Sequence, residues 1–121
     1  MHKIKKTNAE LVSLIQQLKV ESQTRNVALW RKLASRLEKP NKNWAEVNIS
    51  HIKRYAKKND TIVIPGKLLG AGYINIPVTV AAFQSSQNAK EKIVSAGGSV
   101  ISIPELLKKN PKGTGIRLFN K

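Results

Sequence analysis

Hydrophobic residues recur at helical spacing over the first part of the chain. Thr7 and Glu10 have the Thr-x-x-Glu spacing of a capping box. The apolar positions that follow lie at i, i+3, i+4 and i+7, which is typical of one face of an amphipathic helix. We therefore predict a first helix from Thr7 to about Gln23, with an apolar stripe of Leu11, Leu14, Ile15 and Leu18.

A second stretch repeats this spacing and adds positive charge. Asn26 is a candidate N-cap, and Pro40 ends the helix. The apolar stripe consists of Trp30, Leu33, Ala34 and Leu37, and the cations elsewhere on the wheel are Arg25, Arg31, Lys32, Arg36 and Lys39. The pattern predicts a helix with one buried stripe and one cationic face.

A basic loop, "PNKNW", then leads into "AEVN", which predicts a short strand or an extended link. Asn48 or Ser50 caps a third helix. Its inward positions are predicted to be Ile49, Ile52, Tyr55 and Ala56.

From Thr61 onwards the chain is rich in β-branched residues and interrupted by glycines. Strands are predicted at residues 62–64, 77–83, 100–103 and 116–119, with a glycine-rich loop at residues 65–72. Ser86 caps a helix that runs through Ala96 and ends at Gly97-Gly98, and its apolar positions are Ala89, Ile93 and Val94. Ser102 and Glu105 repeat the capping-box spacing before a short helix that ends at Lys109.

These elements predict a mixed α/β fold in a single domain, because 121 residues have room for one sizeable core. The helix-rich residues 1–60 are expected to form a helical layer. That layer is expected to pack on an α/β layer formed by residues 61–121.

The charge points to a polyanionic partner. Lysine and arginine number 22 against 7 aspartates and glutamates, which gives a net charge of +15. A small soluble domain needs far less charge than this. Residues 1–60 carry 14 basic and 5 acidic side chains and residues 61–121 carry 8 and 2, so the excess is not one basic tail. The simpler alternative is a solvated surface, but the size of the excess favours nucleic acid.

Composition also bears on compartment and membrane. The longest apolar run, residues 76–83, is too short to span a bilayer. The basic N-terminus leads into an amphipathic pattern and not into the apolar block of a signal peptide. The chain has no cysteine, which excludes disulfides and thiolate metal sites. We expect a cytosolic protein without a membrane partner.

The segment "PGKLLGAG", residues 65–72, has the composition of a phosphate-binding loop. A Walker A loop needs Ser or Thr after Gly-Lys to bind magnesium, but Leu68 follows Lys67. Gly70-Ala71-Gly72 begins the dinucleotide fingerprint, yet Asn75 stands at the third glycine position and the residues that follow are not helical in pattern. The segment therefore does not predict a nucleotide site.

Catalytic and metal sites are not indicated either. His2 and His51 are the only histidines, the seven carboxylates are scattered singly, and no serine lies in a Gly-x-Ser-x-Gly elbow. We expect no catalytic residue, no metal, no cofactor and no small-molecule substrate.

What remains for basic glycine-rich loops is close approach to a sugar-phosphate backbone, where a Cβ atom would clash and backbone N–H groups can donate to phosphate. Two segments qualify, "PGKLLGAG" and "PKGTG", each with one lysine. The alternative is that their glycines only allow turns with positive φ.

Five segments, in order, resemble the archaeal and eukaryotic large-subunit ribosomal protein family L eighteen e, whose C-terminal part is similar to bacterial ribosomal protein L fifteen. They are "NWAEVNISHIKRYA", "VIPGKLLGAG", "PVTVAAF", "KIVSAGG" and "NPKGTGIRL". The resemblance implies the fold of that family and a structural protein that binds large-subunit ribosomal RNA among other ribosomal proteins. The short length resembles the archaeal form. Residues 73–77, "YINIP", depart from the family pattern, in which a polar or histidine position often precedes the proline.

On this basis we predict a set of RNA contacts without catalysis. Trp44 is either stacked on an unpaired base or packed in the protein. The rival hypothesis is a DNA-binding regulator or chromatin protein that places the second or third helix in a major groove. The predicted contacts are Lys3, Lys5, Lys6, Arg25, Arg31, Lys32, Arg36, Lys42, Trp44, Lys53, Arg54, Gly66, Lys67, Gly70, Gly72, Lys112, Gly113 and Arg117.

Overall fold

The computed structural model describes residues 5–39 and 44–119, with only the backbone described for residues 5–8. The elements are α1 (Lys5–Arg25), α2 (Ala28–Leu37), β1 (Ala45–Asn48), α3 (Ile49–Tyr55), β2 (Thr61–Leu69), β3 (Thr79–Ser85), α4 (Gln87–Ser95), β4 (Ser99–Ser102), α5 (Ile103–Lys109) and β5 (Ile116–Leu118). The predicted mixed α/β fold class is confirmed.

The five described strands form one parallel sheet, in the order β1-β2-β3-β4. β3 pairs along one edge of β2. The opposite edge is shared: β5 pairs with Thr61–Val63 and β1 pairs with Gly66–Leu69. Strand β2 is therefore the centre of the fold, and its length is explained by having two short partners placed end to end on one side.

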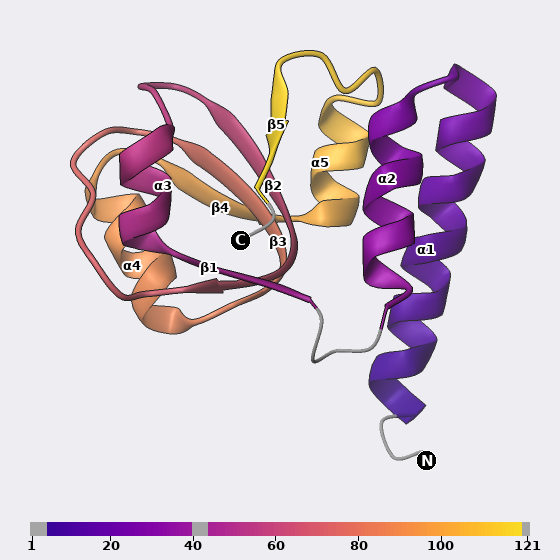
Figure 1. Ribbon diagram of the computed structural model, residues 1–121, viewed down its shortest axis with the longest axis horizontal. Coiled ribbons are helices and arrows are strands. Elements are labelled where there is room, and N and C mark those ends of the chain that lie inside the picture. The colour runs from indigo at the N-terminus through magenta and orange to yellow at the C-terminus, as the bar shows by residue number, and fades with distance from the viewer. Residues whose placement is uncertain (1–4, 40–43, 120–121) are drawn as a thin grey trace.

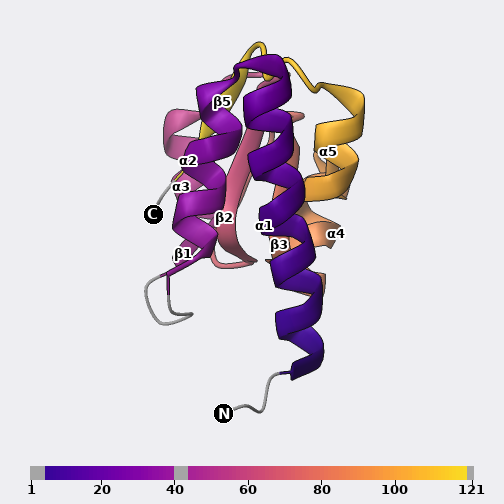
Figure 2. The ribbon, with the colours of Figure 1, turned by 90° about the vertical axis from the view of Figure 1, so that its right-hand side faces the viewer.

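Helices cover both faces of the sheet, as a parallel sheet requires. Figure 1 shows α3 and α4 on one side of the strands and α1, α2 and α5 on the other. In Figure 2, α1 and α2 lie side by side as a helical hairpin. The expected N-terminal helical layer is formed by α1 and α2, but the layers do not follow the two halves of the chain throughout. Helix α3 comes from the helix-rich half but packs with α4, and α5 comes from the α/β half but packs with α1 and α2.

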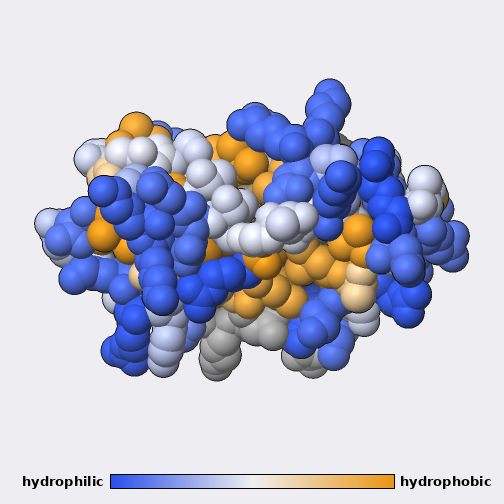
Figure 3. Space-filling model, turned by 90° about the horizontal axis from the view of Figure 1, so that it is seen from above, coloured by the Kyte–Doolittle hydropathy of each residue, from blue (hydrophilic) through white to orange (hydrophobic). Residues whose placement is uncertain are grey.

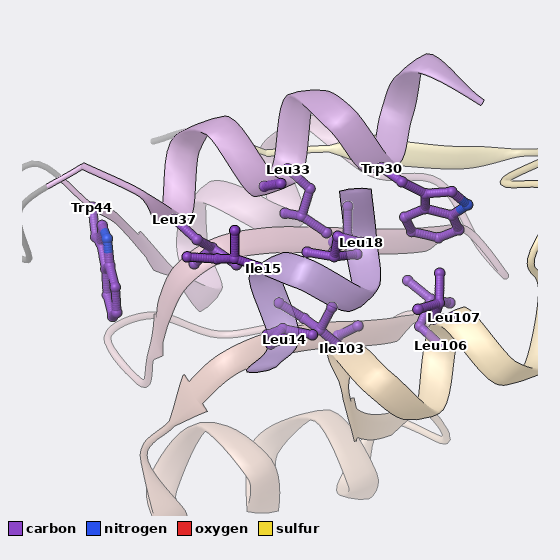
Figure 4. Close-up of a cluster of buried hydrophobic side chains, with 13 residues drawn as sticks. Leu14, Ile15, Leu18, Trp30, Leu33, Leu37, Trp44, Ile103, Leu106 and Leu107 are labelled. Carbon is purple, nitrogen blue, oxygen red and sulfur yellow. The ribbon is translucent and has the colours of Figure 1, made fainter. Parts of the chain in front are cut away.

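Two hydrophobic cores result, one on each face, because successive residues of a strand point to opposite sides. Val63 joins the core under α1, α2 and α5, whereas its neighbours Ile62 and Ile64 join the core under α3 and α4. Figure 4 shows the first core, where the helices place Leu14, Leu18, Trp30, Leu33, Leu37, Ile103, Leu106 and Leu107 against one another. The predicted stripe of α2, including Trp30, is completely buried.

Several helix boundaries differ from the prediction. α1 begins at Lys5, so Thr7 is a helical residue and not an N-cap. The N-cap of α2 is Val27. Asn26 instead lies between the two helices and adopts a left-handed conformation (φ 56°) directly after the last residue of α1. Asn is tolerated there because its short polar side chain reduces the cost of positive φ. The Ser86 and Ser102 caps are confirmed, since their Oγ atoms accept from the backbone N–H of Ala89 and Glu105.

The largest error concerns the predicted glycine-rich loop. Strand β2 continues through Pro65-Gly66-Lys67 to Leu69, with a register shift against β3 between Ile64 and Lys67. Two side chains predicted to face inward are exposed: Tyr55 at the end of α3 and Val94 in α4. The buried residues of these helices are instead Ile49 and Ile52 in α3 and Ala89 and Ile93 in α4.

Candidate nucleic-acid interface

The cationic face predicted for α2 is present. Arg31 and Lys32 are exposed and Arg36 is partly exposed, while the stripe on the other side of the helix is buried. This separation follows from 3.6-residue periodicity, because residues 31, 32 and 36 lie off the line of positions 30, 33, 34 and 37. The three cations can therefore meet a partner without disturbing the core.

Helix α3 carries a second group of cations. Lys53 and Arg54 are exposed in its last turn, and Lys57 and Lys58 are exposed in the link that follows. Cations at a helix C-terminus are favoured by the exposed carbonyl groups there. Viewed from above, hydrophilic residues gather at the two ends of the molecule, over the α3 side and over the α1–α2 side (Figure 3), and hydrophobic residues reach the surface between them.

Two of the predicted contacts are engaged within the protein. Arg117 Nη1 donates to Asp60 Oδ2 at 2.9 Å and to the Tyr55 carbonyl at 3.0 Å, which ties β5 to the end of α3. Arg25 Nε pairs with Glu21 Oε1 at 2.9 Å, one turn earlier in α1. Both side chains remain partly exposed, so each can still offer donors to a phosphate.

Asp60 has the one resolved pKa shift among the described residues. The Lys57 backbone N–H donates to its carboxylate and lowers the pKa of Asp60 below the ordinary value of 3.8. The Arg117 guanidinium lowers the pKa further, and partial burial opposes both effects. The charged carboxylate is therefore part of the hydrogen-bonded connection between β5 and the end of α3.

The glycines of residues 65–72 are explained by contacts within the protein. Gly66 is a buried residue of β2, and a Cβ atom there would overlap the carbonyl oxygen of Ala45 in β1. Gly72 has φ +109°, and a Cβ atom would lie 2.6 Å from the Ser50 nitrogen at the start of α3. A Cβ atom on Gly70 would come closest to the Asn88 side chain, with Nδ2 at 2.7 Å. We therefore no longer propose Gly66 as an RNA contact, because it is buried in β2 between neighbouring strands.

Residues 70–72 also form hydrogen bonds within the protein, through their three carbonyl groups and the Ala71 N–H group. Lys92 Nζ in α4 donates to the carbonyl oxygens of Gly70 and Gly72, at 2.6 and 2.7 Å. The Ala71 carbonyl accepts from Ser50 N–H at 3.0 Å, and Ala71 N–H donates to Asn48 Oδ1 at 3.3 Å. We call residues 70–73 the bracket, since they join α3 to α4. Sequence reasoning missed Lys92 because its partners lie 20 and 22 residues away.

Lys67 is the one cation of the segment, and it lies at the carboxyl ends of β2 and β3. It lines a groove of about 560 Å³ together with Leu68, Phe83, Ser86 and Lys90, among others. Lys90 enters from the first turns of α4 and was not predicted. Two lysines on one groove form a local positive site that suits a phosphate.

The second glycine-rich segment, residues 110–115, lies against the start of α2. Trp30 Nε1 donates to the Pro111 carbonyl at 2.7 Å, and Asn110 Nδ2 donates to the Thr114 carbonyl at 2.9 Å. Gly113 has φ +70°, and a Cβ atom there would contact Val27 and Leu29 side chains. Lys112 is exposed beside it. The structure thus places Lys112 near the N-terminus of the cationic helix.

Trp44 is packed in the protein. Its side chain is 6% exposed, its Nε1 donates to the Lys39 carbonyl at 3.0 Å, and its ring meets Phe83 edge to face at 5.3 Å. This agrees with the packing interpretation and leaves little ring surface for a base. The exposed aromatic side chains are instead Tyr55 and Tyr73. Sequence reasoning missed both, because it assigned Tyr55 inward and treated residues 73–77 only as a departure from the family pattern.

The remaining predicted contacts are only partly described. Lys3 and Lys42 lie outside the described residues, and Lys5 and Lys6 are placed by their backbone in the first turn of α1.

Other kinds of site find little support. Among the described residues, no three His, Asp or Glu side chains come together as a metal site requires. None of the described helices is long and apolar enough to cross a membrane. A second groove, of about 550 Å³, lies between α1 and the start of α5, and Glu10 is the charged residue in its otherwise apolar and neutral lining. It is chemically unlike the lysine groove.

Comparisons with known proteins identify a family and several relatives of similar length. The family model described as "Ribosomal protein 60S L18 and 50S L18e" matches residues 2–120. Among similar proteins, "Large ribosomal subunit protein eL18" of Methanoregula boonei is 48% identical over 96% of both chains. The protein of the same name from Archaeoglobus fulgidus is 50% identical over 96% of this chain and 99% of its own. That from Methanosphaerula palustris is 49% identical over 97% of each chain.

Proposed function

The chain belongs to the family of ribosomal proteins 60S L18 and 50S L18e, and from this premise we propose how it binds ribosomal RNA. It is a structural constituent of the large ribosomal subunit, and association with ribosomal RNA and other ribosomal proteins follows from that membership. The relatives of nearly equal length are archaeal, as the compact length suggested.

The binding we propose is neutralisation of phosphates by two cationic surfaces. One is the face of α2 with Arg31, Lys32 and Arg36. The other is the end of α3 with Lys53 and Arg54. Lys112, the lysine groove and the N-terminal lysines supplement them. The observation that carries this proposal is that the cations of α2 lie exposed opposite a fully buried stripe on a chain with net charge +15.

The DNA-binding hypothesis is not supported. A recognition helix contacts bases through its N-terminal residues. In α3 these residues face the bracket: Asn48 Oδ1 accepts from Ala71 N–H, and Ser50 N–H donates to the Ala71 carbonyl. Helix α3 has only seven residues, and Ile49 and Ile52 are buried in the core under α3 and α4.

A salt series tests the proposal. Binding of the purified protein to archaeal large-subunit ribosomal RNA, transcribed in vitro, should weaken with salt, with a log–log slope of roughly −0.7 to −0.9 for each phosphate neutralised. Replacing Arg31, Lys32 and Arg36 together by Gln should make that slope shallower by about 2 to 3 and leave the melting temperature unchanged.

The matched control replaces Lys108 and Lys109 by Gln. Both are exposed at the end of α5 and are outside the proposed surfaces. Equal losses per charge removed in the triple variant and the double control would show that binding depends on net charge and not on the face of α2. An affinity that does not vary with salt would contradict phosphate neutralisation altogether.

A further inference from the structure

Tyr73 presents an aromatic ring to solvent beside a cation. Its side chain is the most exposed large hydrophobic among the described residues, at 67%. Lys53 Nζ lies 5.9 Å from the centre of its ring. Arg54 follows in α3 and is also exposed. The two elements are far apart in sequence, and the bracket brings them together.

The ring stands on an anchored backbone. Four hydrogen bonds hold the three residues that precede it: two from Lys92, one from Ser50 N–H and one to Asn48 Oδ1. The positive φ of Gly72 turns the chain against the start of α3 immediately before the tyrosine. An exposed side chain on an ordered loop loses less conformational entropy on binding than one on a loose loop.

An exposed aromatic ring next to a cation matches the chemistry of an unpaired nucleotide. A base stacks on the ring face, and neighbouring cations bind its flanking phosphates. A groove that binds a helical or apolar protein segment would instead enclose the hydrophobic side chain of that segment. Here the hydrophobic side chain, Tyr73, belongs to this protein and projects from its surface.

We propose that Tyr73 is a stacking site for an unpaired base of ribosomal RNA, with Lys53 and Arg54 binding the adjoining phosphates. This inference rests on the proposed function, because it takes ribosomal RNA as the partner. It assigns the glycine-rich segment a different role from a phosphate cradle: the glycines shape a bracket that fixes the position of the ring.

Stacking and charge can be separated by salt dependence. Replacing Tyr73 by Leu should lower affinity for in vitro transcribed archaeal large-subunit ribosomal RNA by about tenfold, which lies in the lower part of the range for one stacked base. The slope of affinity against salt should not change, because the ring neutralises no phosphate. Tyr73→Phe should bind like the unmodified protein. Lys53→Met should reduce the slope by roughly 1.

Tyr55→Leu is the matched control, since Tyr55 is 51% exposed, follows Lys53 and Arg54 in α3 and is not on the bracket. Its affinity should stay within about twofold of the unmodified protein, a change well below that of one stacked base. An equal loss in both leucine variants would overturn the assignment to Tyr73. Ultraviolet cross-linking of the unmodified protein provides a second measurement, with a nucleotide adduct expected on Tyr73.

The outcomes distinguish this inference from the function on which it rests. If Tyr73→Leu binds as tightly as the unmodified protein and no adduct forms, while salt dependence stays steep, the stacking site is wrong and phosphate neutralisation stands. If the unmodified protein shows no salt-dependent binding to this RNA, both proposals are wrong.

Discussion

The two glycine-rich segments look alike in sequence and differ in what requires their glycines. In residues 65–72, a Cβ atom on Gly66 or Gly72 would overlap the backbone of another element, so a side chain has no room there. In residues 110–115, a Cβ atom on Gly113 would meet only side chains, and Gly115, with φ +74°, has open space around it. In the first segment glycine is required because other elements pack closely against it, whereas in the second it is required because the turn has positive φ. Composition alone does not separate these two cases.

The largest effect is expected from Gly72→Ala. The new methyl would lie 2.6 Å from the Ser50 nitrogen, on a residue that also has positive φ. The combined strain and displacement should cost about 3 kcal/mol of the free energy of unfolding, measured by urea denaturation. Gly70→Ala is the control, because a Cβ atom there would come closest to the exposed Asn88 side chain and not to the backbone of another element. Similar losses in the two variants would mean that the bracket is generally intolerant of side chains.

Lys92→Met should give the next largest loss. The substitution removes both hydrogen bonds to the Gly70 and Gly72 carbonyls and keeps most of the apolar stem. We expect a loss of about 1–2 kcal/mol, the size expected for partly exposed bonds to a charged group. Lys90→Met, two residues earlier on α4 and exposed, should leave the denaturation midpoint almost unchanged. Equal midpoints for the two variants would contradict the role given to Lys92.

Gly115 tests the second segment. Gly115→Ala should cost roughly 1 kcal/mol through backbone strain alone, because a Cβ atom meets nothing within 4 Å. Gly115→Asn should recover much of that loss, since Asn adopts the left-handed conformation more readily. Thermal melts of the two variants decide the matter. If Asn is as damaging as Ala, conformation is not what requires glycine there.

The smallest effect concerns pH. Because the folded-state pKa of Asp60 is lowered, its contribution to stability is present above the unfolded pKa and is lost as pH falls through the folded value. Melting temperature should therefore decline below about pH 4, the ordinary range of an Asp carboxyl. Asp60→Asn should reduce the acid-dependent part of this decline and lower stability slightly at neutral pH. An unchanged acid profile in Asp60→Asn would show that other carboxylates account for it.

Local periodicity was sufficient for much of the helical structure. The buried stripe of α2 and its opposing cations follow from 3.6-residue spacing, which does not depend on the identity of the neighbour. The Ser86 and Ser102 caps were predictable for the same reason, because each hydroxyl bonds to a backbone N–H three residues later. The cationic part of the candidate interface was therefore found largely from sequence.

The remaining features depend on contacts between distant residues. Pro65-Gly66-Lys67 is turn-like in composition, yet it continues β2 because β1 supplies a strand partner for Gly66–Leu69. Tyr73 becomes a surface feature only because Lys92 and the start of α3 hold the residues before it.

The amino-acid sequence by itself determined the helical stripes, the Ser86 and Ser102 caps, the α/β class and the positive charge, since each is a property of neighbouring residues or of composition. Tertiary structure decided which face of the sheet each helix covers, which cations are paired and which aromatic rings are exposed. Trp44 is buried and Tyr73 is exposed for that reason. Arg117 is likewise paired with Asp60 across 57 residues. Such arrangements depend on pairing energies between segments that no local pattern records.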